Sequence, residues 1–496
     1  MRIGAVVLLS LLGMSVSSAM VAWLTPAASA ADDSSRASWK PAASPRAVGD
    51  AQAEVAAEPV SSTFSVEGPL RLEGRLGHAV LPGEKTNETY VLVEVGAPSE
   101  AAIEARAPVN LSIVIDRSGS MKGQRLDNAV AAARGMVSRL RPNDTVSLVA
   151  YDERAQLLVA PTTVERLDRF GFERTLADLR GGGNTCISCG IDVALAQLRT
   201  RSEAVNRILL LSDGVANRGL TRTEDFRSLG DLARRERTAV ASIGVDVDYD
   251  ERSLFALSQA SNGHHYFVED PTGLPSVFEQ EARSLIGTVA DRVDVEVALA
   301  DGVELVEVIA RGHRREGDRV ALNFGSFNAG EDKSALLRVR VAPGVGDRAI
   351  ADVRLVYREL AAGQEHATDG GLGLTQDPTT TTLARLDPRV EERLGRKDTL
   401  DALLSANEAF AEGDLGTARI RLDAARDRIR RRRSRSGAAR DSKVDRNFEQ
   451  QLQALGGARA GFDDAAQAAP RPKAASKSRK GKKAIRRNAQ VANPFG

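Results

Sequence analysis

Cysteine is nearly absent from this sequence of 496 residues, which contains only Cys186 and Cys189. Two cysteines cannot supply the four ligands of a structural zinc site, so we do not expect one here. Net charge is also lacking, because 68 Lys and Arg residues balance 67 Asp and Glu residues. After the amino terminus there is no further long apolar run. The average composition therefore indicates no class of partner, and a soluble or peripherally held mature protein is expected.

The first thirty residues have the pattern of an export signal. A single Arg2 precedes a mostly apolar stretch, Ile3–Leu24, and Ala28-Ser29-Ala30 is a small-residue cleavage motif. We predict a signal peptide over residues 1–30 and a periplasmic, cell-surface or secreted protein. The alternative is an uncleaved N-terminal helix that anchors the protein, since the apolar stretch is almost long enough to span a bilayer. Residues 31–60, rich in Ala, Ser, Pro and charge, are predicted to be a disordered linker.

Two separated segments show the alternation of half-buried β-strands. Residues 61–107 contain runs such as Val91, Val93 and Val95, and residues 289–378 contain similar runs with apolar side chains at every second position. We expect the two segments to combine in one antiparallel β-sandwich that is interrupted by the residues between them.

Residues 108–288 alternate between apolar β-branched runs and helical periodicity. This alternation predicts a doubly wound, mostly parallel, Rossmann-like sheet. Beyond the first strand, the expected strands are 146–151, 207–212, 238–245 and 264–268, and later helices are expected near 223–235, 251–261 and 274–285.

Three stretches of this α/β segment place oxygen-bearing side chains where a strand or a glycine-rich loop ends. The strand beginning at Leu111 ends at Asp116 and is followed by Ser118 and Ser120 across a turn. Thr185 follows the loop Gly181-Gly182-Gly183-Asn184, and Asp213 ends a second apolar strand. In open α/β sheets, ligands bind beyond the carboxyl ends of the strands, so these side chains are candidates for one site.

This set resembles the metal-ion-dependent adhesion site of von Willebrand factor type A (vWA) domains. The family motif, Asp-x-Ser-x-Ser with a distant Thr and a distant Asp, falls on Asp116, Ser118, Ser120, Thr185 and Asp213, and the resemblance covers about residues 108–288. It implies a bound Mg²⁺, or else Mn²⁺ or Ca²⁺, and a protein partner that presents an acidic side chain. Two carboxylates and three hydroxyls leave such a cation electrophilic. The interrupted sandwich is similar to that of bacterial secreted relatives of the inter-alpha-trypsin inhibitor heavy chains.

The same side chains are compatible with different roles. Ser118 and Thr185 could cap the helices that follow them, with Asp213 in a turn at the end of its strand. The cation could serve a metal-dependent hydrolase or only stabilise a scaffold. A hydrolase needs a general base or an activated nucleophile beside the metal, and the motif stretches offer no His, Glu or Lys placed for that role. We therefore predict a protein that acts in adhesion or protein–protein interaction and is not an enzyme.

The two cysteines and a histidine pair have mainly structural interpretations. Cys186 and Cys189 follow Thr185 at the expected start of a helix, and in an exported chain they are predicted to form a disulfide. A redox centre is the alternative, because a helix N-terminus favours the thiolate. His264 and His265 lie in a strand-like run and are expected to be structural.

The carboxyl-terminal region is predicted to be helical and then disordered. Residues 389–456 carry two apolar stripes separated by Gly413-Asp414, which indicates an antiparallel helix pair. Residues 457–496 are predicted to be a disordered basic tail, with nine Lys and Arg residues and no acid between Arg471 and Arg487. We expect this tail to contact anionic envelope surfaces. We do not expect nucleic acid as a partner, because no aromatic residues for base stacking lie among these charges.

Overall fold

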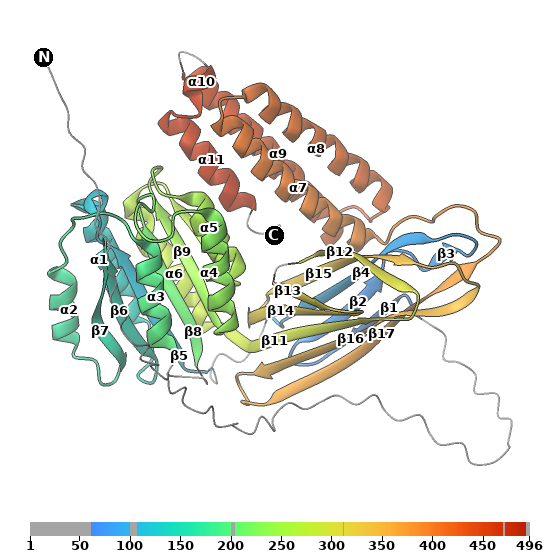
Figure 1. Ribbon diagram of the computed structural model, residues 1–496, viewed down its shortest axis with the longest axis horizontal. Helices are drawn as coiled ribbons and strands as arrows, with labels where there is room; N and C mark the ends of the chain where they lie inside the picture. Colours follow the sequence, from blue (N-terminus) through green and yellow to red (C-terminus); the bar gives the residue numbers. More distant parts are fainter. Residues whose placement is uncertain (1–60, 100–106, 200–203, 311, 470–471, 493–496) are drawn as a thin grey trace, which may run out of the picture. The chain divides into compact units, whose positions relative to one another are not determined.

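The computed structural model describes residues 61–99, 107–199, 204–310, 312–469 and 472–492. The signal peptide and the linker that the sequence predicts over residues 1–60 lie outside the described residues. The described residues belong to one compact unit. They form three β-sheets and a group of carboxyl-terminal helices (Figure 1).

A six-stranded sheet in the order β10-β9-β8-β5-β6-β7 is the centre of the α/β segment. Its neighbouring strands are parallel except for β7, which is antiparallel to β6. The strands are β5 (Val109–Asp116), β6 (Thr145–Tyr151), β7 (Ala155–Thr163), β8 (Val205–Ser212), β9 (Thr238–Val245) and β10 (His265–Val268). Every residue of β5 is buried, because parallel strands are covered on both faces. The predicted doubly wound, mostly parallel sheet is confirmed, although the edge strand β7 was not predicted.

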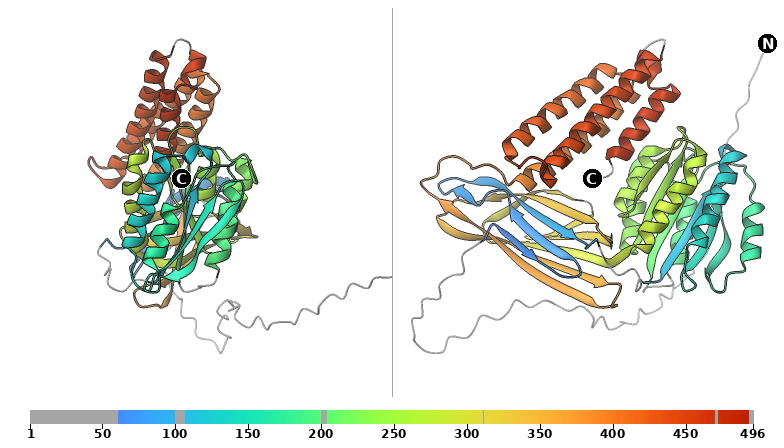
Figure 2. Two further views of the ribbon diagram at one scale, coloured as in Figure 1. Left: turned by 90° about the vertical axis from the view of Figure 1, so that its left-hand side faces the viewer. Right: turned by 180° about the vertical axis from the view of Figure 1, so that it is seen from behind.

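Helices cover both faces of this sheet (Figures 1 and 2). Successive side chains of β5 point to opposite faces, so Ile113 and Ile115 belong to one core and Val114 to the other. The first core contains residues of α1 (Gln124–Ser138), α2 (Arg169–Ala177) and α6 (Leu274–Ile286). The second contains residues of α3 (Ile187–Leu198), α4 (Thr223–Arg235) and α5 (Glu251–Ala260). Two short 3₁₀ turns, η1 (Gly119–Met121) and η2 (Pro271–Gly273), complete the segment.

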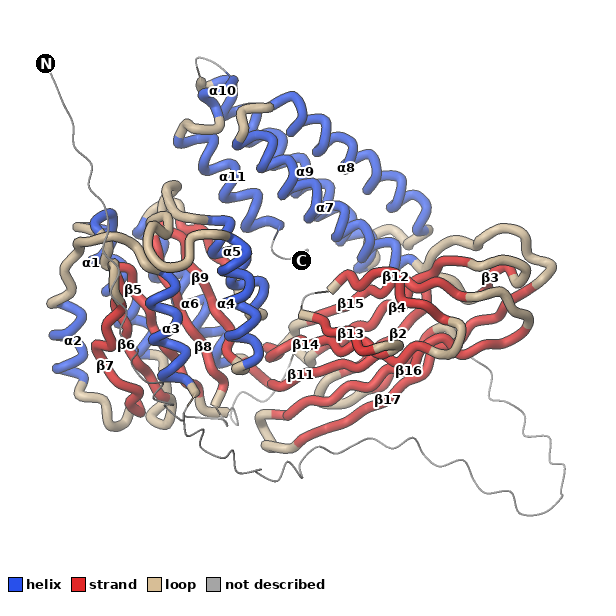
Figure 3. The backbone as a smooth tube through the Cα atoms, in the orientation of Figure 1, coloured by secondary structure: helices blue, strands red, loops and turns tan. Residues whose placement is uncertain are grey.

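The strands before and after the α/β segment pair with each other (Figure 3). One sheet has the order β1-β2-β4-β15-β12, in which β4 pairs antiparallel with β15 from Asn87↔Val341 to Gly96↔Asp332. The other has the order β13-β14-β11-β16-β17-β3. Both sheets contribute to a single apolar core. The strands are β1 (Thr63–Val66), β2 (Arg71–Leu76), β3 (Val80–Pro82), β4 (Asn87–Gly96), β11 (Thr288–Leu299), β12 (Val303–Ile309), β13 (His313–Glu316), β14 (Arg319–Asn328), β15 (Asp332–Val341), β16 (Gly346–Glu359) and β17 (Glu365–Asp377).

The carboxyl-terminal region contains more helix than the predicted pair. The two apolar stripes correspond to α7 (Pro388–Ala411) and α8 (Leu415–Ser436), and a third long helix, α9 (Lys443–Gln467), packs against both. The three helices share one core, in which Phe410 stacks on Phe462 with ring centroids 4.2 Å apart. The start of α7 packs against the sandwich, where Val390 and Leu394 meet Leu92 of β4.

The prediction of a disordered basic tail from residue 457 is wrong for the described residues. Helix α9 continues to Gln467, a short helix α10 spans Pro472–Ala475, and α11 spans Arg479–Ala492. The prediction failed because it counted only the charges of the tail itself. In the structure, cations of α11 pair with acids of the α/β segment, for example Lys482 with Asp248 at 2.5 Å. Partners distant in sequence thus offset the local excess of like charge that would disfavour a fold.

Candidate metal centre

The three predicted stretches meet at the carboxyl edge of the central sheet. The turn after β5 is joined to the glycine-rich loop by two backbone hydrogen bonds: Gly182 donates to the carbonyl of Arg117 at 2.7 Å, and Gly119 donates to that of Gly183 at 3.2 Å. The turn after β8 approaches both, since a Cβ atom on Gly214 would lie 3.3 Å from the Thr185 hydroxyl and 3.5 Å from that of Ser120. These close contacts leave little room for a side chain at residue 214.

Asp116 occupies the innermost position of this cluster. Its side chain is fully buried, and one carboxylate oxygen accepts a hydrogen bond from the backbone N–H of Ser118 at 2.7 Å. The other accepts from the hydroxyl of Ser212 at 2.9 Å and from that of Tyr151 at 3.3 Å. Burial raises the pKa of Asp116 to about 6, and these hydrogen bonds from the serines oppose the rise. The carboxylate is therefore held in one orientation by neutral donors.

Ser118, Ser120 and Asp213 form a chain of polar contacts beside Asp116. The two serine hydroxyls are 3.1 Å apart, and the Ser120 hydroxyl donates to a carboxylate oxygen of Asp213 at 2.6 Å. Burial raises the pKa of Asp213, while hydrogen bonds from Ser120 and Arg125 lower it. Two carboxylates and the serine hydroxyls are thus gathered within a few ångströms from segments about a hundred residues apart in sequence.

Thr185 completes the predicted set from the glycine-rich loop. Its backbone N–H donates to the side-chain oxygen of Asn217 at 2.8 Å, and its carbonyl accepts from the backbone N–H groups of Asn217 and Arg218. A helix-capping role for the two hydroxyls is not supported. Ser118 makes no side-chain capping bond to η1, and the N-cap of α3 is Cys186 rather than Thr185. The hydroxyls of Ser118 and Thr185 are therefore not used as helix caps.

Sequence reasoning missed three residues that support the cluster. Ser212 and Tyr151 donate to Asp116, and burial raises the pKa of Tyr151 well above its ordinary value. Arg125, at the start of α1, donates to Asp213 at 2.8 Å and to Asp246 at 2.6 Å. The position of Arg125 shortly after the serine motif could have drawn attention to it, but its partners lie 88 and 121 residues away in sequence.

The cysteines and His265 have the positions expected of structural groups, while the ring of His264 lies 3.9 Å from the carboxylate of Glu281. Cys186 and Cys189 are joined in a disulfide across the first turn of α3. His265 is buried between the hydroxyls of Ser242 and Tyr249, at 2.8 and 3.1 Å from its two ring nitrogens. Burial lowers the pKa of His265 to about 3, so the ring is neutral near pH 7. Among the described residues, no group of three or more His, Cys, Asp or Glu side chains could hold a metal ion. Any cation in this cluster would therefore depend on hydroxyl ligands as well.

Comparison with known proteins agrees with this geometry. The family model of the von Willebrand factor type A domain matches residues 110–280. This segment is a vWA domain. An uncharacterised protein of Synechocystis sp. is 24% identical over 326 residues, which are 63% of this chain and 76% of that protein. The mouse inter-alpha-trypsin inhibitor heavy chain H2 is 26% identical over 167 residues, but these cover only 17% of its length.

A solved structure extends the likeness beyond the vWA domain. The von Willebrand factor type A protein from Catenulispora acidiphila matches with a TM-score of 0.64 and 19% identity, and the match covers 81% of this chain and 90% of that one. At this identity the likeness concerns the fold. The family is mostly non-enzymatic, its domains typically mediate protein–protein interaction, and they often bind a divalent metal. Within the described residues, none of the helices has the length and apolar character needed to cross a bilayer.

Proposed function

We propose that this is an exported, non-enzymatic protein whose vWA domain binds a partner protein through a divalent cation held by Asp116, Ser118, Ser120, Thr185 and Asp213. The convergence of these five side chains at the carboxyl edge of the sheet is the observation that supports it. Carboxylate and hydroxyl oxygens are hard ligands of the kind that Mg²⁺ prefers, with Mn²⁺ and Ca²⁺ as alternatives. Export is supported by the pattern of residues 1–30.

The charge around the cluster favours an acidic group as the partner's contribution. Asp116 and Asp213 would together neutralise a divalent cation. The guanidinium of Arg125, 2.8 Å from Asp213, then adds one positive charge to the site. A carboxylate from a partner would offset that charge. It would also fill a coordination position of the cation that the protein's own side chains do not occupy. The bound cation would supply the electrophilic centre for this contact, and Arg125 would favour the approach of an anion.

The surroundings of the cluster favour binding over hydrolysis. The described polar groups that contact the two carboxylates include Ser212, Tyr151 and Arg125, and in these contacts they act as hydrogen-bond donors. A phenol with a raised pKa, such as that of Tyr151, stays protonated at neutral pH and cannot accept a proton from water.

Contact between the basic tail and anionic envelope surfaces is the less favoured part of the proposal. Lys482, Lys483 and Arg486 of α11 are each paired with an acid of the vWA domain. An anionic surface would have to compete with these intramolecular ion pairs. We therefore assign partner binding to the metal centre first.

Titration calorimetry of the purified chain with MgCl₂ and with MnCl₂ tests the proposal. We expect one site per chain, and we expect Asp116→Asn and Asp213→Asn to weaken it at least tenfold, because each removes half of the formal negative charge among the five ligands. Asp127→Asn is the matched control, since Asp127 is an exposed carboxylate in the first turn of α1, two residues after Arg125. Equal affinity in the wild type and both cluster variants would contradict the proposed ligands.

Partner binding is tested with the same variants. Envelope proteins retained by the immobilised chain in Mg²⁺ should be released by a chelator and should not be retained by Asp213→Asn. Circular dichroism would check that each variant is folded. Retention that is unchanged by the chelator would place recognition elsewhere on the molecule.

A further inference from the structure

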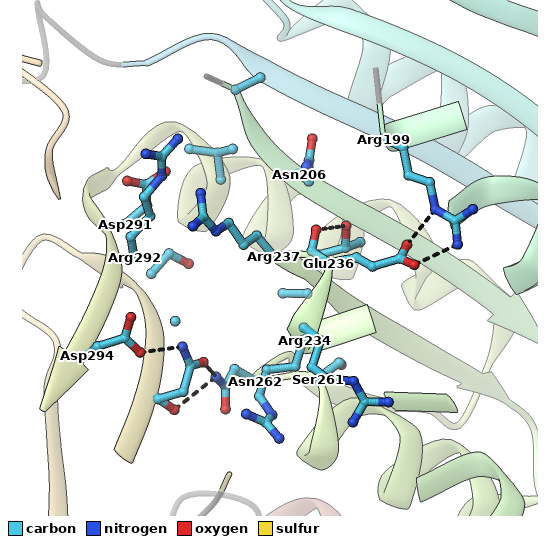
Figure 4. A pocket seen from close by; sticks show the side chains of 18 residues that line it. Arg199, Asn206, Arg234, Glu236, Arg237, Ser261, Asn262, Asp291, Arg292 and Asp294 are labelled. Carbon is cyan, nitrogen blue, oxygen red and sulfur yellow. Dashed lines mark hydrogen bonds and ion pairs between the residues drawn. The ribbon is translucent and has the colours of Figure 1, made fainter. Parts of the chain in front are cut away.

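A cavity lies at the edge of the central sheet opposite the candidate metal centre. It has a volume of about 460 Å³ and is formed where the vWA domain meets strands β11 and β14 of the sandwich (Figure 4). On the vWA side it is lined by the first residues of β8 and β9, whereas Asp116 ends β5 and Asp213 follows β8, at the opposite edge of the sheet. Its volume falls in the range of small-molecule sites, which are common at domain junctions.

Arginine dominates the polar lining of this cavity. Five arginines and three acids line it, which is an excess of two positive charges: Arg199, Arg234, Arg235, Arg237 and Arg292, with Glu236, Asp291 and Asp294.

Each of the three acids already has a hydrogen-bond donor. Arg199 donates to both oxygens of Glu236, at 3.0 and 2.6 Å, and Arg358 donates to both oxygens of Asp291, at 2.8 and 2.6 Å. Asp294 accepts from Asn323 at 2.7 Å and is attracted electrostatically by Arg237. Two carboxylates outside the lining offset part of the charge, since Arg234 pairs with Asp231 at 3.0 Å and Arg292 lies 3.7 Å from Glu365. With these acids and with Arg358 included, six arginines stand against five acids, and one positive charge remains in excess.

Two of these arginines stand at backbone positions that favour glycine. Arg237, which joins α4 to β9, and Arg292, at an irregularity of β11, both have a φ of 54°. A side chain in this left-handed region costs on the order of 1 kcal/mol relative to glycine. Despite that cost, both residues line the same cavity, and the Arg237 side chain extends across it towards the wall that carries Asp291 and Arg292 (Figure 4).

Hydrogen bonds connect the two walls. The Asn262 amide, on the vWA side, donates to the side-chain oxygen of Asn323 on β14 at 2.9 Å and to its carbonyl at 3.2 Å. Asn323 in turn holds Asp294 of β11. A site whose walls are tied in this way needs little reorganisation to accept a ligand.

We propose that this cavity is a binding site for a small multiply charged anion, of the phosphate or polycarboxylate class, and that Arg237 and Arg292 supply the main contacts. Guanidinium groups bind both anion types through paired N–H donors. The site is separate from the metal centre and does not depend on the function proposed for it.

Calorimetric titration of the full chain with inorganic phosphate, and separately with citrate, tests the site. We expect saturable binding of at least one of the two, and the stronger one identifies the anion class. Arg237→Gly should weaken it at least tenfold without unfolding the protein, because glycine suits the backbone at this position. Arg292→Gly should act in the same direction. Arg227→Gln is the matched control on an exposed position of α4 outside the cavity, and should bind as the wild type does.

The two glycine variants and the Arg227→Gln control distinguish the possible outcomes. Binding that is lost in both glycine variants and kept in Arg227→Gln supports the site. The proposal is overturned if neither phosphate nor citrate binds saturably. It is also overturned if Arg237→Gly and Arg292→Gly leave the binding unchanged. Arg237→Lys keeps the charge but not the paired donors, so a weakened response in this variant would identify guanidinium geometry rather than charge alone as the determinant.

Discussion

Arg125 is the residue that connects the candidate metal centre to the rest of the vWA domain. Its guanidinium lies between the carboxylates of Asp213 and Asp246, and it also donates to the carbonyl of Ser120 at 3.1 Å. The loop that contains Asp246 is tied to the same turn, because the Asp250 N–H donates to the carbonyl of Gly214 at 3.2 Å. Arg125 therefore neutralises a carboxylate that a bound cation would also use.

Replacing Arg125 should move stability and metal affinity in opposite directions. In Arg125→Gln, Asp213 loses its cationic partner, so the metal-free protein should be destabilised by about 1 kcal/mol. Mg²⁺ should bind several-fold more tightly, because it no longer competes with a guanidinium for Asp213. Thermal unfolding in chelator and Mg²⁺ calorimetry measure the two effects, with Arg134→Gln on the same helix as the control. Weaker Mg²⁺ binding in Arg125→Gln would show instead that Arg125 helps to shape the site.

His265 should make the folded protein sensitive to acid. Its pKa of about 3 in the folded state lies below the value of about 6.5 for an exposed histidine. Between about pH 3 and about pH 6.5 the unfolded chain binds more protons than the folded one. The stability that the neutral His265 ring contributes is therefore fully present above about pH 6.5 and is lost as the pH falls. Lowering the pH from 7.5 to 5 should cost about 2 kcal/mol through this group alone.

The substitution His265→Gln isolates this contribution. An amide can retain polar contacts with Ser242 and Tyr249 but does not titrate. Urea unfolding at pH 7.5 and at pH 5 should show that the variant loses about 2 kcal/mol less stability than the wild type over this interval. Equal losses would mean that His265 is not the acid-sensitive group. The comparison between the two proteins removes the contributions of the other histidines.

At the scale of elements, the vWA domain was predictable and its surroundings less so. Strand β9 and helix α4 have the bounds that the sequence predicts, because long periodic apolar patterns face a shared core. The edge elements β7 and α2 bury only part of their side chains, and their patterns were too weak to detect. The helix α11 was missed for a different reason. Its stability depends on acids that lie more than two hundred residues away in sequence.

The same distinction applies to the candidate metal centre. Its five oxygen-bearing side chains belong to a motif in which residue type and local turn can be read directly from the sequence. The supporting contacts of Ser212 and Tyr151 depend on strand register, because β5 lies between β6 and β8. A sequence shows that these strands exist but does not give the register that brings those hydroxyls to Asp116.

Helix α11 should depend on one buried ion pair more than on its exposed ones. Arg486 pairs with Glu251, whose side chain is 7% exposed, and its guanidinium lies 4.7 Å from the ring centre of Tyr249. Arg487 pairs with Glu269 but is itself 64% exposed. Loss of a buried partner leaves an uncompensated charge and costs about 3 kcal/mol, whereas exposed pairs contribute about 1 kcal/mol or less.

Hydrogen exchange of residues 479–492 measures this difference. In Arg486→Gln the amides of α11 should exchange much faster than in the wild type, because the helix detaches from the vWA domain. Arg487→Gln is the matched control and should have little effect. If both variants exchange alike, the docking of α11 depends on its apolar contacts with α9 and α7 rather than on the ion pair.

At the scale of the whole molecule, the chain enters and leaves the vWA domain from the same sandwich. Strand β4 precedes the domain and β15 follows it, yet they pair along ten residues each. The vWA domain is therefore an insertion between neighbouring strands, and the sandwich core needs segments from both sides of it. Helix α7 depends on this junction too, since Arg393 pairs with Glu94 of β4 at 2.5 Å.

Removal of residues 1–96 should consequently disrupt folding far beyond the deleted strands. The deletion removes β1, β2, β3 and β4, so the backbone N–H and C=O groups of β15 that pair with β4 lose their partners. It also uncovers the apolar side chains of the opposite sheet. An unpaired, apolar strand edge promotes association between molecules, so we expect aggregation in size-exclusion chromatography.

Removal of residues 1–60 alone is the control, because it leaves every described strand in place. A monomeric and cooperatively unfolding product from the longer deletion would show that the sandwich is not one folding unit. Because the vWA sheet takes no strand from residues 61–96, Mg²⁺ binding should outlast the damage to the sandwich in any fraction of the truncated chain that stays soluble.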